Sequence, residues 1–478
     1  MKEYGEVMEV RQDIVHVAGL TNCMFGQMVG LAETTKGVVV GFDPDYVLVL
    51  VVQEADKIKP GDRVTSSIET FRLPVGERFL GRCVNALAES LDGREPIEPS
   101  GWYPLFGSAP SVLDRVPVRE VLQTGIKIID MMIPLGKGQR ELIIGDRVTG
   151  KTTIATDAIL AQKGKNVTCI YCCIGKAESS LARVVDLLDE AGAMEYSIVV
   201  SATASCPMGQ QYLAPYLASS LGEFLMHEQG RDVLVVFDDL TKHAWIYRQM
   251  SLLLERSPGR DAYPGDIFYL HSQLVERAGK LKPERGGGSM TFLPIVETLQ
   301  GDVARYIPSN LISITDGQIY TRTPLFSEGF RPAIDLGLSV SRIGNKVQWP
   351  AMKQLSSMLR LEHVRYKELV KLTRIKAAAS EDIEQRLRKG QVVEETLKQD
   401  KNSPASMEDQ VMVLYALAKG VFSSMAPSDV GSAQKKLIAH IRKHAPDLVE
   451  DLIARKDLTR EIREGLDEQL ADFAHTSI

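Results

Sequence analysis

The sequence predicts a multidomain protein with an N-terminal β-barrel, a central α/β domain whose sheet is mainly parallel, and a C-terminal α-helical bundle. Three kinds of local pattern follow one another along the 478 residues. Short runs rich in valine and isoleucine come first, longer apolar runs alternating with helical patterns follow, and a part poor in glycine and proline ends the chain. At about 150 residues per domain, the length also predicts roughly three domains.

The first segment, residues 1–70, contains strand-like runs separated by turn sequences. The runs include DIVHV, GVVV and YVLVLVV, and the turns include DPD and KPGD. Short strands at close spacing, joined by glycine and proline turns, are typical of a small antiparallel barrel. We therefore predict an all-β barrel domain over 1–70.

The middle segment, residues 71–349, alternates apolar runs of strand length with helical patterns. The predicted strands are ELIIG, VTCIYCCI, YSIVVSA, DVLVVFDD and LISI. Runs that are apolar throughout are typical of parallel strands buried on both faces, and helices between them indicate crossover connections. This segment is predicted to be an α/β nucleotide-binding domain.

The last segment, residues 350–478, shows helical periodicity. Ser406 and Asp409 form a capping-box pattern ahead of an apolar stripe. The stripe has the spacing i, i+3, i+4 and i+7 in Val411, Leu414, Tyr415 and Ala418. We predict a helical bundle over 350–478.

Composition excludes several classes of protein. The apolar fraction of 44% and the charged fraction of 25% argue against a disordered chain. The longest purely apolar run, Tyr46–Val52, is far shorter than the roughly 18 residues of a membrane span, and the mixed charges at the start do not suggest a signal peptide. A net charge of −6 gives no general attraction to nucleic acid, and six cysteines are too few for a disulfide framework, as in a reducing cytosol.

The sharpest motif is GDRVTGKT, a complete G-x-x-x-x-G-K-[ST] between the strand ELII and the helical TTIATDAILAQ. Such a loop turns backbone N–H groups toward phosphates, its lysine reaches the β- and γ-phosphates, and its threonine hydroxyl binds Mg²⁺. The motif predicts that ATP or ADP binds with Mg²⁺. The predicted phosphate-binding residues are Gly145, Asp146, Arg147, Val148, Thr149, Gly150, Lys151, Thr152 and Thr153.

Two aspartates end the strand VLVVF. A P-loop uses a carboxylate on a neighbouring strand to hold the metal and its waters, and Asp238 is the natural candidate beside Thr152. The alternative is that these aspartates only cap the next helix, a role for which Asp239 is the better candidate.

No obvious base for hydrolysis follows the next predicted strand. The residue at the expected place is Lys176, which is charged at neutral pH and cannot accept a proton from water without a large depression of its pKa. Glu178 would have to reach back by two residues. The sequence therefore suggests a site that binds Mg-nucleotide without turning it over.

The cysteines of CIYCC resemble a metal-binding pair but lie in an apolar strand without a second CxxC, so we expect them to be structural. The eight histidines occur singly and form no metal-ligand pattern.

Longer stretches resemble the α chain of F-type ATP synthases. VLQTGIKIIDMMIPLGKGQRELIIGDRVTGKT follows that family's run into its P-loop, and DDLTKHAWIYRQMSLLLERSPGRDAYPGDIFYLHSQLVERA is similar to its segment after the metal-binding aspartate. ITDGQIY and PAIDLGLSVSRIG resemble the signature shared by α and β chains. The resemblance is close from Tyr4 to about Gln410 and looser beyond.

The resemblance implies a regulatory subunit of a rotary ATPase. Its α sites bind Mg-nucleotide without catalysis, and three α chains alternate with three catalytic β chains around a central γ-type shaft. The complex couples ATP synthesis or hydrolysis to translocation of protons or sodium ions. The chain is then expected on the cytoplasmic side of the energy-transducing membrane, attached only through partner subunits, with no nucleic acid. The family's N-terminal extension, which docks onto a peripheral stalk, is missing ahead of Tyr4. Either the stalk attaches differently, or the branch is divergent, or the sequence is truncated.

Position by position, the resemblance gives Arg342 the catalytic role of the arginine finger, which reaches the γ-phosphate in the neighbouring β site. A guanidinium suits this because its charge is permanent and its fork matches phosphoryl oxygens. The alternative is an arginine paired structurally with a nearby carboxylate.

The same comparison implies an adenine pocket and three departures from the family pattern. Phe326, Arg331 and Pro332 match positions lining the pocket, and Gln399 matches a glutamine that contacts the base. The departures are Lys176 for the usual glutamine, Val148 for the P-loop glutamine and Lys401 for a second pocket glutamine.

Two other functions remain open. A self-sufficient homohexameric ATPase of the protein-export type shares this core, but it should keep a catalytic glutamate where Lys176 stands. The other is a P-loop protein with only a scaffolding role, and Arg342 at the end of the signature argues against that interpretation.

Overall fold

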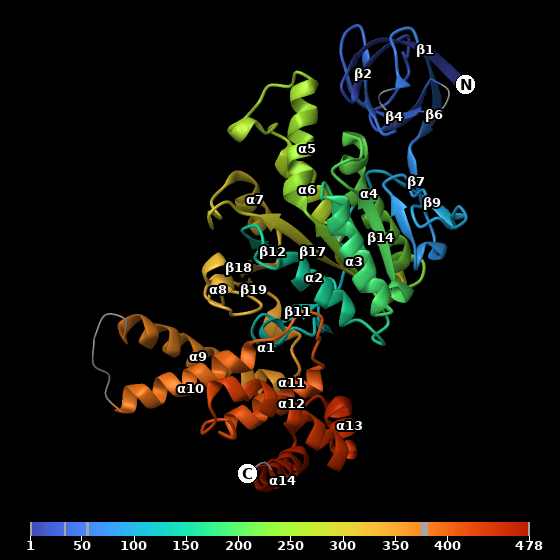
Figure 1. The fold of residues 1–478 in the computed structure, drawn as a ribbon. Coiled ribbons are helices and arrows are strands. Elements are labelled where there is room, and N and C mark those ends of the chain that lie inside the picture. The colour runs from blue at the N-terminus through green and yellow to red at the C-terminus, as the bar shows by residue number, and fades with distance from the viewer. Residues whose placement is uncertain (1, 33–34, 54–56, 374–380, 477–478) are drawn as a thin grey trace. The chain divides into compact units, whose positions relative to one another are not determined.

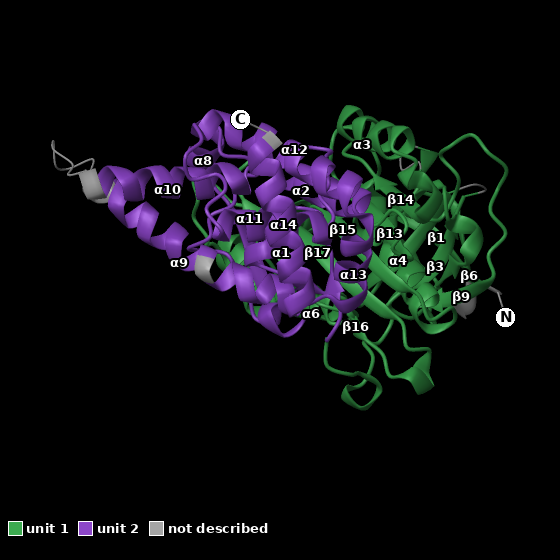
Figure 2. Ribbon diagram, turned by 90° about the horizontal axis from the view of Figure 1, so that it is seen from below, with its two compact units in different colours: residues 1–118, 137–147, 162–316 green, residues 119–136, 148–161, 317–478 purple. Residues whose placement is uncertain are grey.

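The structure is a computed structural model of the full chain, and it describes all residues except 1, 33–34, 54–56, 374–380 and 477–478. Contacts divide the chain into two compact units (Figure 2). The first unit comprises 1–118, 137–147 and 162–316, and the second comprises 119–136, 148–161 and 317–478. The predicted domain boundaries near residues 70 and 350 stay predictions.

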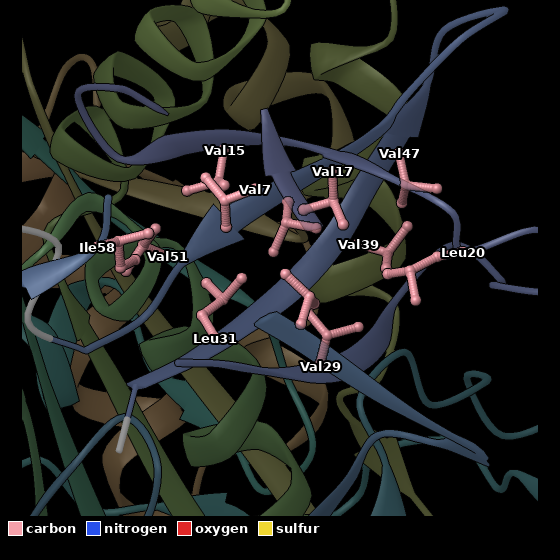
Figure 3. Close-up of a cluster of buried hydrophobic side chains, with 12 residues drawn as sticks. Val7, Val15, Val17, Leu20, Val29, Leu31, Val39, Val47, Val51 and Ile58 are labelled. Atoms are coloured by element: carbon pink, nitrogen blue, oxygen red, sulfur yellow. The ribbon is translucent and has the colours of Figure 1, made fainter. Parts of the chain in front are cut away.

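The first unit begins with a closed barrel whose strands run in the order β1-β2-β5-β4-β3-β6 (Figure 1). The strands are β1 (Lys2–Arg11), β2 (Ile14–Ala18), β3 (Gln27–Leu31), β4 (Thr35–Phe42), β5 (Val47–Val51) and β6 (Arg63–Thr70). Valines, leucines and one isoleucine fill the interior, among them Val15, Val29 and Leu31 (Figure 3). In β2 and β5 every second residue belongs to this buried cluster, and the barrel predicted from the runs DIVHV, GVVV and YVLVLVV is confirmed.

The rest of the first unit is a parallel sheet in the order β12-β17-β15-β13-β14-β8, with β16 antiparallel to β17. The strands are β8 (Cys83–Asn85), β12 (Glu141–Gly145), β13 (Val167–Ile174), β14 (Ser197–Ala202), β15 (Asp232–Asp238), β16 (Gly279–Lys280) and β17 (Ser289–Glu297). A separate antiparallel pair joins β7 (Arg72–Val75) and β9 (Gly101–Pro104). Four apolar runs predicted as strands are therefore β12 to β15, and the mainly parallel sheet is confirmed.

The helices of the first unit lie between the parallel strands in the sequence, or after the last of them. They are α3 (Glu178–Glu190), α4 (Met208–His227), α5 (Leu240–Leu253), α6 (Ile267–Val275) and α7 (Tyr306–Ile314). α4 contacts β13, β14 and β15 and is buried along nearly its whole length. It covers one face of the sheet and buries the side chains that these strands turn toward it.

One strand prediction is wrong. LISI, residues 311–314, lies in α7 rather than in a strand. A run of four apolar or small residues cannot distinguish a strand from a helical segment. The residues before it decide, since Ile307 and Leu311 stand one helical turn apart and are both buried.

The second unit contains two short strand pairs and the helical C-terminal part. Its strands are β10 (Val121–Leu122), β11 (Leu135–Gly136), β18 (Gly317–Thr321) and β19 (Val340–Ser341). Its helices are α1 (Lys127–Met132), α2 (Lys151–Leu160), α8 (Thr323–Ser327), α9 (Pro350–Thr373), α10 (Glu381–Leu397), α11 (Met407–Ala418), α12 (Pro427–His444), α13 (Pro446–Arg455) and α14 (Arg460–Thr476).

The predicted helical bundle is confirmed in α9 to α14. α10 contacts α9 and α12, and α12 contacts α13 and α14. Ser406 caps α11 by accepting a hydrogen bond from the backbone N–H of Asp409, as the capping-box pattern predicts. Leu414, Leu437 and Ile441 are among the residues buried in the bundle.

Candidate functional site

The P-loop joins β12 to α2, and the chain passes from the first unit to the second between Arg147 and Val148. Gly150 has a φ of 91°, a left-handed conformation that favours glycine, directly before the first turn of α2. Val148 also has a positive φ, 63°, and its side chain is 84% exposed. The loop therefore has the strand–turn–helix setting that the phosphate-binding motif requires.

In the first unit, the charged side chains of the loop hold it to the sheet. Asp146 accepts hydrogen bonds from the hydroxyl of Thr298 at 2.6 Å and from the backbone N–H of Gly301 at 2.8 Å. The guanidinium of Arg147 donates to Glu297 at the end of β17, at 3.1 Å. These two members of the predicted phosphate-binding set therefore anchor the loop with their side chains.

Asp238 ends β15, and parallel pairing places it opposite Cys173 of β13. Its side chain is fully buried. The hydroxyl of Tyr171, also on β13, donates to Oδ2 of Asp238 at 2.8 Å. The ammonium group of Lys176, just past the end of β13, forms an ion pair with Oδ1. The predicted metal-binding carboxylate thus contacts a tyrosine and a lysine of the neighbouring strand and its following loop.

Asp239 has a different role from its neighbour. Its side chain accepts a hydrogen bond from the backbone N–H of Lys242 at 2.8 Å and caps α5, which confirms that Asp239 is the capping aspartate. Burial raises the pKa of Asp239 to about 7, and the negative charge of Asp238 adds to this shift.

Glu178, the weaker candidate for a base, begins α3 and is exposed. The hydroxyl of Ser205 donates to its Oε1 at 2.6 Å. The CIYCC cysteines Cys169, Cys172 and Cys173 are buried in β13, and burial raises the pKa of the Cys173 thiol to about 12. A metal ligand must be a thiolate, so this environment does not suit metal binding.

The two residues predicted as Mg²⁺ ligands offer a threonine hydroxyl and a carboxylate, which are hard oxygen donors of the type that Mg²⁺ prefers. The surroundings of Asp238 do not fit a metal there, however. One of its oxygens accepts from Tyr171 and the other pairs with the Lys176 ammonium. A metal ion cannot bind Asp238 while Lys176 remains in its present position.

In the second unit, the P-loop threonines and lysine lie in or beside the first turn of α2. Lys151 is buried, and Thr152 and Thr153 are partly buried. The hydroxyl groups of Thr149 and Thr321 form a hydrogen bond of 2.7 Å, which joins the loop to the end of β18. The N-terminus of α2 has the backbone N–H groups and the dipole that stabilise phosphate.

Three of the residues predicted for the adenine pocket come together in the second unit. The Arg331 guanidinium lies 4.7 Å from the centroid of the Phe326 ring, in cation–π geometry. Pro332 follows directly and, like Phe326, is partly buried. The ring and the guanidinium over it are both planar groups, of the kind on which a planar base can stack.

Gln399 is tied to the backbone. Its Nε2 donates to the carbonyl oxygens of Gly125 and Ser403, both at 2.7 Å, and its Oε1 accepts from the N–H of Lys127 at 2.8 Å. Its own N–H donates to the carbonyl of Arg331 at 2.9 Å. The side chain fixes the segment before α11 to the start of α1, and a contact with a base would have to replace one of these bonds.

Lys401, which stands in place of the second pocket glutamine, is exposed. The next residue, Asn402, donates its N–H to Asp157 of α2 at 2.9 Å. Burial raises the pKa of Asp157 to about 6, and the bond from Asn402 and the charge of Lys401 oppose that shift.

Arg342 follows β19 directly and is exposed. Leu338 and Val340, just before it, are also exposed, at 50% and 45%. An exposed cation thus follows two half-exposed apolar side chains at this end of the segment.

Sequence reasoning did not find Tyr171. The signal was present, since Tyr171 stands two residues before Cys173 and so lies on the same side of β13, and Cys173 is opposite Asp238. It could be used only once β13 and β15 were known to pair in this register.

The parallel sheet, the P-loop ahead of α2 and the carboxylate at the end of β15 define the class: a P-loop nucleotide-binding protein with an N-terminal barrel and a helical C-terminal part. Family models of the ATP synthase alpha/beta family match all three parts. The beta-barrel domain matches residues 1–67, the nucleotide-binding domain 125–341, and the C-terminal domain 348–473.

Curated relatives narrow the assignment. Proteins named ATP synthase subunit alpha from Clostridium botulinum strain Eklund 17B and from Petrotoga mobilis are 47% and 45% identical to this chain. The alignments cover 98% and 99% of this chain and 93% and 94% of those relatives. The chain therefore belongs to the family of ATP synthase alpha subunits.

Membership of this family makes the chain a nucleotide-binding part of an ATPase complex that assembles with other ATP synthase subunits. Among the described residues, no helix has both the length and the apolar character of a membrane span.

Proposed function

We propose that this chain binds ATP or ADP at its P-loop without hydrolysing it, and that it is a regulatory subunit in a ring of alternating alpha and beta-type chains. The observation on which this proposal depends most is the position of Lys176. It stands where a base would have to act on water, and its ammonium is ion-paired with Asp238. An ammonium group cannot accept a proton, and Glu178 is bound to Ser205.

Arg342 is proposed to act in trans, as an arginine finger that reaches the γ-phosphate in the site of a neighbouring beta-type chain. Its exposure beside the uncovered side chains of Leu338 and Val340 supports a place in a subunit interface. A permanent, forked cation at that place would stabilise charge on the transferred phosphoryl group.

The wider assembly follows from the family as part of the same proposal. Three copies would alternate with three beta-type chains around a gamma-type shaft, with the peripheral stalk as a further contact. The complex would couple ATP synthesis or hydrolysis to the movement of protons or sodium ions. It would lie on the cytoplasmic side of the membrane and be attached through partner subunits.

The expectation that Mg²⁺ accompanies the nucleotide, with Thr152 and Asp238 as ligands, stays a prediction. A second possibility is that the ammonium group of Lys176 takes the place of the metal at Asp238, and one experiment decides between the two.

The test of this proposal is to measure ATP binding and ATP hydrolysis by the full-length chain alone, and then in a mixture with its beta-type chain. We expect binding without hydrolysis for the chain alone and hydrolysis by the mixed ring. Hydrolysis by a homohexamer of this chain would instead establish the protein-export type of ATPase.

The arginine finger is tested in the mixed ring with Arg342→Ala. Turnover should fall by about 10³-fold or more, while this chain keeps its own affinity for ATP. Arg183→Ala is the matched control, because Arg183 is exposed on α3 and bonds within its own helix. Near-normal turnover with Arg342→Ala would contradict the role.

A further inference from the structure

The ion pair between Lys176 and Asp238 joins a fully buried side chain to one that is partly exposed to solvent. Asp238 has 0% of its side chain exposed, whereas Lys176 has 20% exposed. The lysine side chain is therefore partly open to solvent, whereas the carboxylate that it pairs with is not.

The second oxygen of the carboxylate is engaged as well. Tyr171 is buried in β13 and its hydroxyl donates to Oδ2 at 2.8 Å. One carboxylate oxygen thus has a neutral donor from the sheet, and the other has a cation from the loop after β13. Its charge is balanced within the first unit by a residue of this chain.

A hydrated metal cannot reach this carboxylate while Lys176 stays in place. Mg²⁺ loses its waters reluctantly and usually keeps several of them when it binds, so it needs an open approach to its ligand. An ammonium group at the ligand closes that approach. It also repels a dication at short range, in a place where the buried partner is poorly screened by water.

We propose that Lys176 serves as the resident counter-ion of Asp238, in the place of the divalent metal, so that the nucleotide binds to this chain with little dependence on Mg²⁺. The inference rests on the proposed nucleotide binding at the P-loop. A lysine cannot be lost to a chelator, so the site would stay occupied when the free concentration of Mg²⁺ falls. Lys176 is in this sense a residue that sets the metal requirement of the site.

The experiment compares ATP affinity of the full-length chain by calorimetry in excess Mg²⁺ and in excess EDTA. For the natural chain, we expect the two dissociation constants to agree within about threefold. In Lys176→Gln, Asp238 becomes available to a metal, and EDTA should weaken ATP binding by about tenfold or more. Mg²⁺ titration of each protein at fixed ATP gives the same comparison without the chelator.

Two further variants make the result specific. Lys176→Met removes the charge at nearly constant length and should behave like Lys176→Gln, which keeps the test valid where one variant folds poorly. Lys59→Gln changes an exposed lysine of the barrel and should leave the natural ratio unchanged.

The possible outcomes separate the inference from the function on which it rests. ATP binding that already depends about tenfold on Mg²⁺ in the natural chain, and equally in Lys176→Gln, overturns the role of Lys176 and leaves nucleotide binding intact. No binding of ATP in either condition overturns the proposed function itself.

Discussion

The two units hold their functional side chains in opposite ways. In the first unit, Asp238 is buried and is contacted by two other side chains, those of Tyr171 and Lys176. In the second unit, Phe326 and Arg331 contact each other at a partly open surface. The first arrangement is a buried charged network, and the second is a surface formed by α8 and the segment that follows it.

This difference predicts which property, stability or nucleotide affinity, a substitution in each unit should change. A buried charge that loses its partner is costly because it keeps its desolvation penalty. A partly exposed ring that is removed leaves a surface that water can fill. Substitutions around Asp238 should therefore lower the free energy of unfolding, and substitutions around Phe326 should lower nucleotide affinity.

The largest effect is expected for Asp238→Ala. It leaves the Lys176 ammonium and the Tyr171 hydroxyl without the carboxylate that both contact. We expect the free energy of unfolding to fall by about 3 kcal/mol, measured by urea denaturation. Asp186→Ala, at an exposed position on α3, is the control and should change it by less than about 0.5 kcal/mol. Equal stabilities of the two variants would break the comparison.

A smaller loss is expected for Tyr171→Phe, which removes only the hydroxyl that donates to Oδ2 of Asp238. One buried carboxylate oxygen then lacks a donor, and we expect a loss of about 1–2 kcal/mol in the same urea experiment. Because the aromatic ring is kept, no cavity forms. An unchanged midpoint and slope would show that the hydroxyl contributes nothing.

The second unit should respond differently. Phe326→Ala removes the ring on which a base is proposed to stack beside Arg331, and ATP affinity should fall by about tenfold. The free energy of unfolding should change by less than about 1 kcal/mol, since the ring is only partly buried. Phe42→Ala, at an exposed position of the barrel, is the control for ATP affinity. A loss of stability without a loss of affinity would contradict the proposed pocket.

Local patterns predicted much of the first unit. ELIIG and VTCIYCCI form β12 and β13 over the same residues, because a continuous apolar run can be satisfied only by burial on both faces. The P-loop has its fixed spacing, and the position of Asp239 directly before a helical pattern identified the cap. These features depend on neighbours in the sequence.

The features that were missed depend on long-range pairing. Tyr171 contacts Asp238 only because β13 and β15 pair in one particular register. Gln399 contacts Lys127, 272 residues away in the sequence, and no local pattern carries such a contact. The strand prediction for LISI was wrong for a related reason, since the residues that precede it in α7 determine its conformation. The role proposed for Lys176 could be inferred only from the P-loop motif together with the ion pair between Lys176 and Asp238.

The smallest effect concerns Asp157, a buried carboxyl of the second unit, whose pKa is raised to about 6 mainly by burial. The folded protein holds this proton more tightly than the unfolded chain, in which an aspartate has a pKa of about 3.9. The stability contributed by the protonated form is therefore present at low pH and is lost as pH rises from about 4 to about 6. Asp157→Asn keeps an acceptor for the N–H of Asn402 but carries no charge.

The variant should consequently be more stable than the natural chain at pH 8, and this advantage should shrink by about 1 kcal/mol at pH 5. Urea denaturation of both proteins at the two pH values measures the difference, and the titrations that they share cancel. An advantage that does not change with pH would mean that Asp157 is solvated. The contrast between Asp238, whose charge is balanced by Lys176, and Asp157, whose pKa is determined mainly by burial, would then disappear.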